Sequence, residues 1–310
     1  MRRLPVTTRY LSLALLLAGS AAASPLGSVF DEGEADAEPS SASPLLRTPE
    51  ALVQRVRGDA SLPLPERMAA ISQPWVGTTG YLLGALGEGG GVDPQPVTRY
   101  DVFDCLTFVE EVLALALSPD PARAHEVRMA LRYRGGEPWT YENRRHFMLS
   151  EWIPGTIEEG WVEDITATLP GAVPRSKTVS AQTWAGWRPR ASFPLADERL
   201  PVGTMDFHLW PLDAAEESLD AVPPGALVFT VRALWEHLPI AITHVGILVP
   251  GTRPTLRHAS RLGQNKGVKD SSFAWYTEHQ RSYDAWPVEG YIVLMPLEQG
   301  PRRVRAERAP

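Results

Sequence analysis

The order of patterns along the chain predicts an α+β fold. Apolar helical patterns occupy the first half of the sequence, and short β-branched and aromatic runs separated by turn residues occupy the last third. Such segregation of helices and strands favours α+β over an alternating parallel arrangement. The only cysteine, Cys105, lies where a polar stretch changes into the strongest helical run. We therefore expect extra N-terminal helices, a core helix that begins near Cys105, and an antiparallel sheet that this helix packs on.

The first 23 residues are typical of a secretory signal peptide. Three arginines precede an apolar stretch over 11–23 that ends in three alanines. This stretch is too short to span a bilayer, so we expect no stable membrane insertion. The prediction is an exported protein of the periplasm or cell envelope. Its formal net charge of −7 becomes more negative without the signal arginines, which disfavours nucleic-acid binding.

Composition then divides the rest of the chain. Residues 24–47 are rich in Ala, Ser, Pro and acidic residues and are predicted to form a disordered stem. One domain is expected over 48–296, with helices that open at Thr48-Pro49 and Leu64-Pro65. Residues at about 167–225 are rich in proline and weakly periodic, and we interpret them as an insertion. A basic tail follows over 297–310.

The strongest helical signal runs from Asp104 to about Leu117. Its apolar residues cover most of the circumference, which is typical of a core helix. Cys105 lies in the first turn, where unpaired N–H groups and the helix dipole lower a thiol pKa. A lone cysteine in an exported protein has no internal disulfide partner. We expect a reactive thiol, and the alternative is an inert buried one.

Two histidines lie on consecutive predicted strands. The strands are expected over 226–231, 240–249, 255–260 and 290–295. Alternation puts His244 and Gly246 on one face, and the glycine suggests that another element, such as the cysteine helix, approaches the backbone there. A hairpin can place His258 beside His244, with Ser260 on the same face as His258. A cysteine needs a histidine base and a third polar group for nucleophilic catalysis.

These residues carry a family resemblance. Four motifs occur in the order seen in NlpC-type papain-like cysteine peptidases. They are the Asp104-Cys105 pair, the run Gly225-Ala226-Leu227-Val228-Phe229, the strand around His244 and the pair His258-Ala259. Other segments more closely resemble the N-acetylmuramoyl-L-alanine amidase-like branch of that superfamily. These segments are 101–110, 132–136, 143–147 and 151–153. The resemblance covers roughly residues 48–296.

The resemblance implies a papain-like (NlpC-type) core and an exported cysteine amidase that acts on peptidoglycan. It implies Cys105 as the nucleophile, His244 as the general base and His258 as the third residue, with Ser260 as the alternative third residue. The implied reaction is hydrolysis of the N-acetylmuramoyl-L-alanine amide bond through a thioester, with no cofactor. Cleavage between D-glutamate and the diamino acid of the stem peptide is the alternative.

Further residues are candidates for substrate contacts. The arginines could clamp carboxylates of a stem peptide, or could be solvated helix residues. The aromatic residues could line a groove, or pack in the core. The candidates are Tyr100, Asp104, Arg134, Arg144, Arg145 and Trp152.

A metal site has little support in the sequence. Asp206 and His208 could ligate a metal, but the sequence has no His-Glu-x-x-His motif and no cysteine pair, and we assign no metal ligand. A metal-dependent amidase and a non-catalytic wall-binding module are the remaining function classes.

Overall fold

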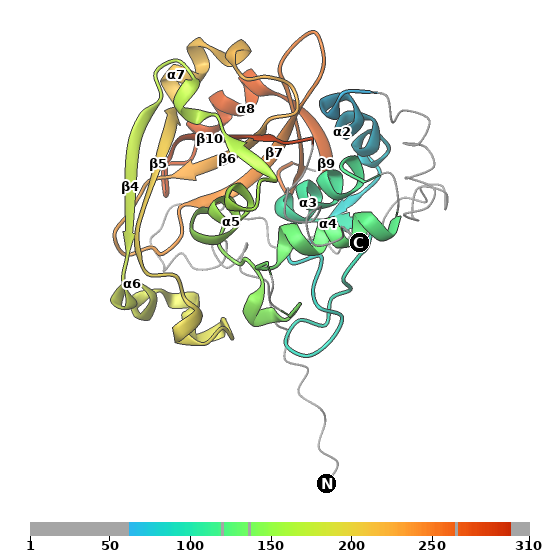
Figure 1. Ribbon diagram of the computed structural model, residues 1–310. Helices are drawn as coiled ribbons and strands as arrows, with labels where there is room; N and C mark the ends of the chain where they lie inside the picture. The colour runs from blue at the N-terminus through green and yellow to red at the C-terminus, as the bar shows by residue number, and fades with distance from the viewer. Residues whose placement is uncertain (1–61, 119–120, 136–137, 264–265, 299–310) are drawn as a thin grey trace.

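The computed structural model describes residues 62–118, 121–135, 138–263 and 266–298, and one mostly antiparallel sheet forms its centre (Figure 1). Within these residues the strand order is β2-β1-β9-β8-β7-β6-β10-β5-β4, and β3 pairs with β10. The pair β1–β2 is parallel, and the other pairs are antiparallel. The predicted α+β class is confirmed.

The strands are β1 (Gly80–Tyr81), β2 (Val102–Phe103), β3 (Val162–Asp164), β4 (Val173–Val179), β5 (Gly203–Pro211), β6 (Leu227–Arg232), β7 (Ile242–Val249), β8 (Thr255–Ser260), β9 (Gly267–Ser272) and β10 (Val288–Pro296). The α-helices are α2 (Leu64–Ser72), α3 (Cys105–Ala116), α4 (Pro121–Arg132), α5 (Ile153–Glu158), α6 (Ala181–Gly186), α7 (Leu212–Glu217) and α8 (Phe273–Gln280). A π-helical turn, η5 (Met148–Trp152), precedes α5. Short 3₁₀ turns are η3 (Gln73–Trp75), η4 (Tyr141–Asn143), η6 (Thr166–Thr168), η7 (Arg188–Ser192), η8 (Asp197–Arg199) and η9 (Leu219–Ala221).

Helices pack on both faces of the sheet. Val245 and Ile247 of β7 belong to the apolar cluster that contains the inner residues of α2, α3 and α4. Leu248 points the other way, into a second cluster with α7 and α8. Figure 1 shows α2, α3 and α4 together at the right of the view and α7 and α8 at its top. Because successive side chains of β7 point to opposite faces of the sheet, this strand contributes residues to both apolar clusters.

The start of α3 is held by a capping box. The Asp104 carboxylate accepts the Thr107 backbone N–H at 2.8 Å, and the Thr107 hydroxyl receives the Asp104 backbone N–H at 3.0 Å. A second carboxylate oxygen of Asp104 accepts the N–H of Gly84 at 3.2 Å. This reciprocal capping fixes the first turn of the helix, and therefore the position of Cys105.

Two buried ion pairs join α3 to α4. Glu111 pairs with Arg128, and Glu110 pairs with Arg132 at 3.0 Å, with all four side chains at most 3% exposed. The Trp152 indole N–H also donates to Glu110, at 3.1 Å. Helix α3 is therefore buried on every side, as its sequence predicts, but its two acidic residues are inside the core with arginine partners.

The predicted strands correspond to β6, β7, β8 and β10, while β1 to β5 and β9 were not predicted. Strand β9 is polar, with the sequence Gly-Val-Lys-Asp-Ser-Ser, and therefore has no apolar alternation. It forms because β8 supplies a full antiparallel ladder from Thr255↔Ser272 to Ser260↔Gly267. Long-range pairing outweighs the weak strand propensity of these residues.

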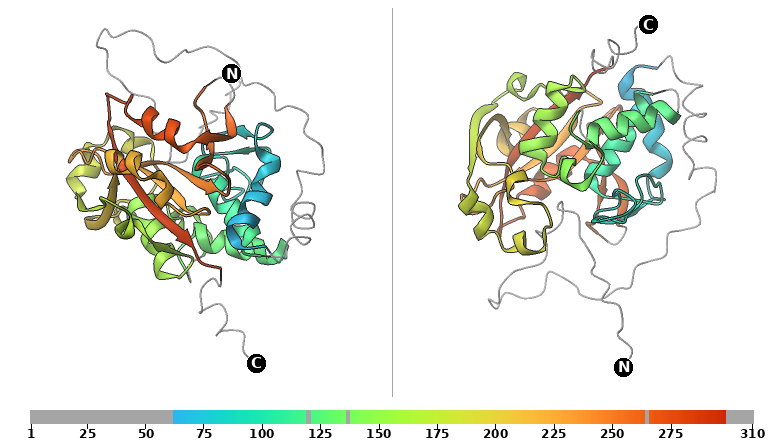
Figure 2. Two further views of the ribbon diagram at one scale, coloured as in Figure 1. Left: turned by 90° about the horizontal axis from the view of Figure 1, so that it is seen from above. Right: turned by 60° about the horizontal axis from the view of Figure 1, so that its bottom comes forward.

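Residues 167–225 form the β4–β5 hairpin with α6 between its strands, followed by α7. Strand β5 pairs with β10, so this region continues the central sheet. An aromatic cluster around Trp184, Trp187 and Phe193 packs at its far end. Figure 2 shows this hairpin on the side of the molecule opposite to the blue and green N-terminal helices.

Several predicted segments lie outside the described residues. They are the signal peptide over 1–23, the stem over 24–47, the helix predicted at Thr48 and most of the tail over 297–310. In the described part of the chain, no helix combines the length and the apolarity that a membrane crossing requires.

Candidate active site

Cys105 is the first residue of α3 and lies against strand β7. Its residue surface is 3% exposed. Backbone N–H groups of Val245, Leu106 and Cys105 itself lie close enough to the sulfur to lower its pKa. Val245 directly follows His244 in the chain, so the thiol lies beside the strand that carries the candidate base.

The environment of this thiol opposes ionisation. Burial raises the pKa of Cys105 to about 12, and the neighbouring Asp104 carboxylate adds to the rise. The backbone N–H groups work in the opposite direction but do not compensate. The expectation of a lowered thiol pKa at the helix start is therefore wrong, because desolvation outweighs the helix terminus.

The two histidines are in direct contact across β7 and β8. His244 Nε2 and His258 Nδ1 are 2.7 Å apart, and the rings meet edge to face with centroids 4.9 Å apart. The ladder between the strands covers only Ile247↔Arg257 to Val249↔Thr255. The β6–β7 ladder shifts register between the pairs Val231↔Ile242 and Thr230↔His244, so Thr243 is the extra residue on β7. His244 itself stays in register opposite Thr230, and its ring centroid lies 6.1 Å from that of Tyr276 on α8.

Gly246 makes room for this contact. A Cβ atom at Gly246 would lie 2.9 Å from Leu256 and 3.0 Å from the Cβ of His258. An element does approach the backbone here, as the glycine suggested, but at the Cβ position it is β8 and not the cysteine helix. The approaching groups are side chains of β8, because the α3 side of β7 is taken by Val245 and Ile247.

The far nitrogen of His258 contacts a residue that sequence reasoning missed. His258 Nε2 and the hydroxyl of Ser271 on β9 are 3.1 Å apart. Ser260, the alternative third residue, instead accepts the Leu262 backbone N–H at 3.2 Å. Recognition of β9 as a strand would have put Ser271 beside β8, but its polar sequence gave no such signal.

Both imidazoles are held neutral. Burial lowers the pKa of His244 to about 4, and the guanidinium of Arg232 contributes to this shift. Burial also lowers the pKa of His258 well below its ordinary value, with further contributions from His244 and Lys269. At neutral pH the thiol and both imidazole rings are therefore uncharged.

Two tyrosines complete the surroundings. The Tyr276 ring from α8 lies edge-on to His258 at 5.4 Å between centroids, and its hydroxyl hydrogen-bonds Thr230 at 2.8 Å. Burial raises the pKa of Tyr81 on β1 above its ordinary range, and Cys105 and Asp104 add to the rise. Tyr81 is thus a neighbour of the thiol that the sequence analysis did not single out.

Comparison with known proteins identifies the family. The model of the family described as AmiA-like, N-acetylmuramoyl-L-alanine amidase-like, matches residues 70–283. The chain belongs to this amidase-like family. Cys105, His244, His258 and Ser271 all lie inside the matched range, and the family resemblance seen in the sequence is confirmed.

Solved structures share the fold of this family member. A Legionella pneumophila protein, LPG0564, matches with a TM-score of 0.67 and 23% identity over 80% of this chain and 94% of that chain. An N-acetylmuramoyl-L-alanine amidase from Bacteroides uniformis matches with a TM-score of 0.60 and 19% identity over 76% of this chain and 99% of that chain. A search among curated proteins gives no match. At these identities the structural likeness concerns the fold.

The arginine candidates for substrate contacts have partners inside the protein. Arg144 pairs with Glu88 at 2.8 Å and with Asp93 at 3.1 Å. Arg145 pairs with Glu159 and donates to the backbone carbonyls of residues 130 and 131. Arg134 pairs with Glu151, and its side chain is 34% exposed. The structure therefore gives the two buried arginines a structural role, because their charged groups are already neutralised.

The other three substrate candidates are buried. Tyr100 stacks on Trp75 with ring centroids 5.9 Å apart, and its hydroxyl accepts from Arg128 at 3.3 Å. Asp104 caps α3, and Trp152 has no exposed surface. The structure places all three inside the protein with partners of their own, and their assignment to substrate contacts stays a prediction.

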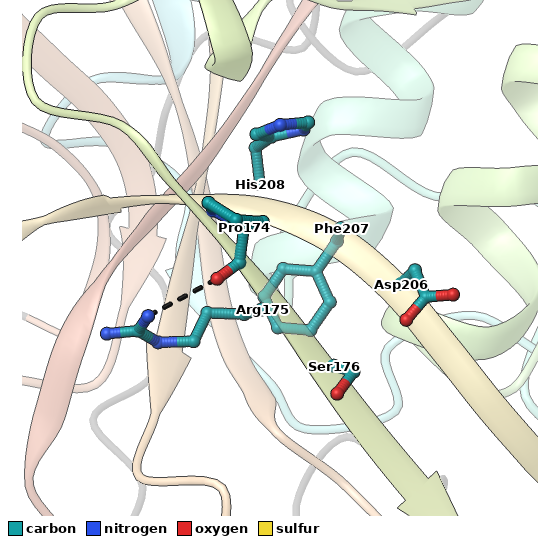
Figure 3. Close-up of a pocket in the computed structure, with 6 residues that line it drawn as sticks. All are labelled: Pro174, Arg175, Ser176, Asp206, Phe207 and His208. Carbon is teal, nitrogen blue, oxygen red and sulfur yellow. Dashed lines mark hydrogen bonds between the residues drawn. The ribbon is translucent and has the colours of Figure 1, made fainter.

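Asp206 and His208 lie on β5, away from the histidine pair. They line an open surface pocket of about 580 Å³ together with residues 174–176 and Phe207 (Figure 3). Figure 3 shows the Asp206 carboxylate and the His208 ring apart from each other, with no convergence on one point. Among the described residues, no group of three or more His, Cys, Asp or Glu side chains is arranged to hold a metal ion.

Proposed function

We propose that this protein is an exported cysteine amidase that hydrolyses the N-acetylmuramoyl-L-alanine bond of peptidoglycan. Membership of the amidase-like family supports an amidase and a peptidoglycan-related substrate. The observation that carries the residue assignment is the contact of 2.7 Å between His244 Nε2 and His258 Nδ1, together with the backbone N–H of Val245, the residue after His244, next to the Cys105 sulfur. A nucleophile, a base and an orienting group are the parts that acyl transfer needs.

In the proposed reaction, Cys105 attacks the amide carbonyl carbon. Because the thiol is uncharged at neutral pH, its proton moves to His244 as the S–C bond forms. His258 holds Nε2 of His244, which leaves Nδ1 of His244 as the nitrogen that receives this proton. His244 then gives the proton to the leaving amine, and water hydrolyses the thioester with His244 again as base.

The first turn of α3 would stabilise the developing oxyanion. The N–H groups of Cys105 and Leu106 lie next to the sulfur, and the N–H of Thr107 is occupied by Asp104. Preorganised donors at a helix start are suited to the negative charge of a tetrahedral intermediate. No group from outside the chain is required for this chemistry.

The finer structural assignments belong to the same proposal. We propose that the sheet and α3 form a papain-like core of the NlpC type, in a domain over 48–296 with an insertion at about 167–225. Residues 1–23 would direct export to the periplasm or cell envelope. The remaining alternatives are a D-glutamyl-diamino acid endopeptidase, a metal-dependent amidase and a non-catalytic wall-binding module.

Digestion of purified peptidoglycan tests the proposal. The wild-type protein should release stem peptides with a free L-alanine amino group, identified by mass spectrometry. Cys105→Ala should lower the rate by more than about a thousandfold, because the residual activity of enzymes without their nucleophile is small. Its fold should be retained, since only a small buried group is removed.

Each alternative predicts a different outcome. Fragments cut after D-glutamate would indicate the endopeptidase. Loss of activity in EDTA with a fully active Cys105→Ala protein would indicate the metal-dependent class. Binding to peptidoglycan with no fragments released by the wild type would indicate the wall-binding module. Any of these results would contradict the proposed function.

A further inference from the structure

We propose that Ser271 is a positioning residue of this site, which accepts the N–H of His258 when His244 carries the proton of the thiol. This inference rests on the proposed function, since it assigns a role within the same proton transfer. The role of Ser271 is inferred from the geometry alone, because neither its sequence context nor the family description singles this residue out.

The contact extends the histidine pair across three neighbouring strands. His244 is on β7, His258 on β8 and Ser271 on β9, with 2.7 Å between the ring nitrogens and 3.1 Å from His258 to the hydroxyl. The ladder pairs Ser271 with Leu256, so the hydroxyl reaches His258 diagonally. His258 is 1% exposed, and water therefore has little access to its second nitrogen.

The protonated state allows only one arrangement of hydrogens. An imidazolium at His244 has N–H groups at both nitrogens, so its Nε2 must donate to His258 Nδ1. A neutral His258 that accepts at Nδ1 carries its own hydrogen at Nε2. That hydrogen points to Ser271, whose hydroxyl oxygen accepts it. Without the hydroxyl, a buried N–H would lose its partner at the moment when charge forms.

The charges around His258 favour this arrangement. Lys269 lies directly opposite His258 in the β8–β9 ladder, and its ammonium donates to the Leu262 carbonyl. A positive group at this position disfavours a second proton on His258. Nδ1 of His258 therefore remains a hydrogen-bond acceptor for the N–H of His244. The proton of Cys105 therefore stays on His244 until the leaving amine takes it, and no proton passes to His258 or Ser271.

Kinetics on the full-length protein test this role. Ser271→Ala should lower kcat by about ten- to a hundredfold, the range expected when a buried N–H is left without its partner, with KM nearly unchanged. Ser271→Thr keeps a hydroxyl and should retain most of the activity. Ser282→Ala is the matched control, because it also removes one hydroxyl hydrogen bond, to the His279 carbonyl at 2.8 Å, and should leave kcat unchanged.

A spectroscopic readout separates positioning from folding. In the Cys105→Ala protein with ¹⁵N-labelled histidine, the His258 ring should be protonated at Nε2, and Ser271→Ala in that background should add the Nδ1-protonated form. A His258 ring protonated at Nδ1 with Ser271 intact would overturn the inference. If Cys105→Ala is inactive but Ser271→Ala keeps full kcat, the inference about Ser271 is also overturned. If Cys105→Ala is active, the result contradicts the proposed function instead.

Discussion

At the scale of single residues, the environment of Cys105 and His244 is set by desolvation. Cys105 is buried and His244 is half-buried, and desolvation raises the pKa of the thiol to about 12 and lowers that of the imidazole to about 4. Each shift disfavours the charged form. A thiolate-imidazolium pair is therefore unfavourable in the free protein, and charge separation belongs to the reaction itself. This makes the hydrogen-bond partners of His244 important for the rate.

The two histidines should differ in their effect on activity. His244→Ala should cost nearly as much as Cys105→Ala, about a thousandfold or more, because a general base takes part in proton transfer. His258→Ala should cost less, about ten- to a hundredfold, because it only orients His244. Rates of peptidoglycan digestion by the two variants check this order. If His258→Ala is as active as the wild type, the contact between His244 and His258 does not contribute to the reaction.

At the scale of elements, the position of the thiol depends on how the first half of the chain is joined to the sheet. Helix α3 carries buried Glu110 and Glu111, which arginines of α4 neutralise. A similar arrangement holds the loop before the helix, where Glu88 and Asp93 surround Arg144. Removal of one member of a buried pair leaves an uncompensated charge. These pairs therefore constrain the site through the backbone and do not need to touch substrate.

Arg144→Gln distinguishes the structural role from substrate binding. We expect the free energy of unfolding to fall by about 3 kcal/mol, because Glu88 and Asp93 lose their partner. The KM of the folded protein should stay near that of wild type. Denaturant unfolding and digestion kinetics measure the two quantities, with Arg175→Gln on the exposed β4 strand as control. A raised KM without loss of stability would restore the assignment of Arg144 to substrate.

At the scale of the whole molecule, stability is linked to pH through buried neutral histidines. The pKa of His244 is about 4 in the folded protein and near its ordinary value of about 6.5 in the unfolded chain. Between these two values the unfolded chain binds more protons than the folded protein. The free energy of unfolding therefore decreases as pH falls from about 6.5 to about 4. The raised pKa values of Glu110 and Glu151 act in the opposite direction.

Comparison with a variant isolates the contribution of His244. In His244→Gln, the decrease in the free energy of unfolding between pH 6.5 and 4 should be smaller by on the order of 2 kcal/mol. The contributions of the Glu110 and Glu151 carboxyl groups should remain. Urea unfolding at a series of pH values measures this difference. His208→Gln, at an exposed ring on β5, is the matched substitution. A wild-type and a His244→Gln protein with parallel pH dependence would contradict the link.

The sequence by itself determined the class of fold, the core helix and three residues of the candidate site, Cys105, His244 and His258. Segregated helical and strand patterns indicated α+β, and the change from a polar stretch to an apolar run at Asp104 indicated the start of α3, where the structure has its N-cap. The position of Cys105 before an apolar run and the two histidines on successive strands needed only local periodicity. These features are local, so neighbouring residues in the chain are sufficient to predict them.

The tertiary structure decided what local patterns could not encode. Strand β9 exists because β8 offers a partner, and only its register brings Ser271 to His258. The buried arginines look like surface residues in the sequence, because their carboxylate partners are distant or on another element. The thiol pKa depends on how much of the sheet covers Cys105, and desolvation is a property of the packed molecule. Long-range pairing and burial, which no short window of sequence contains, therefore set the chemistry of the site.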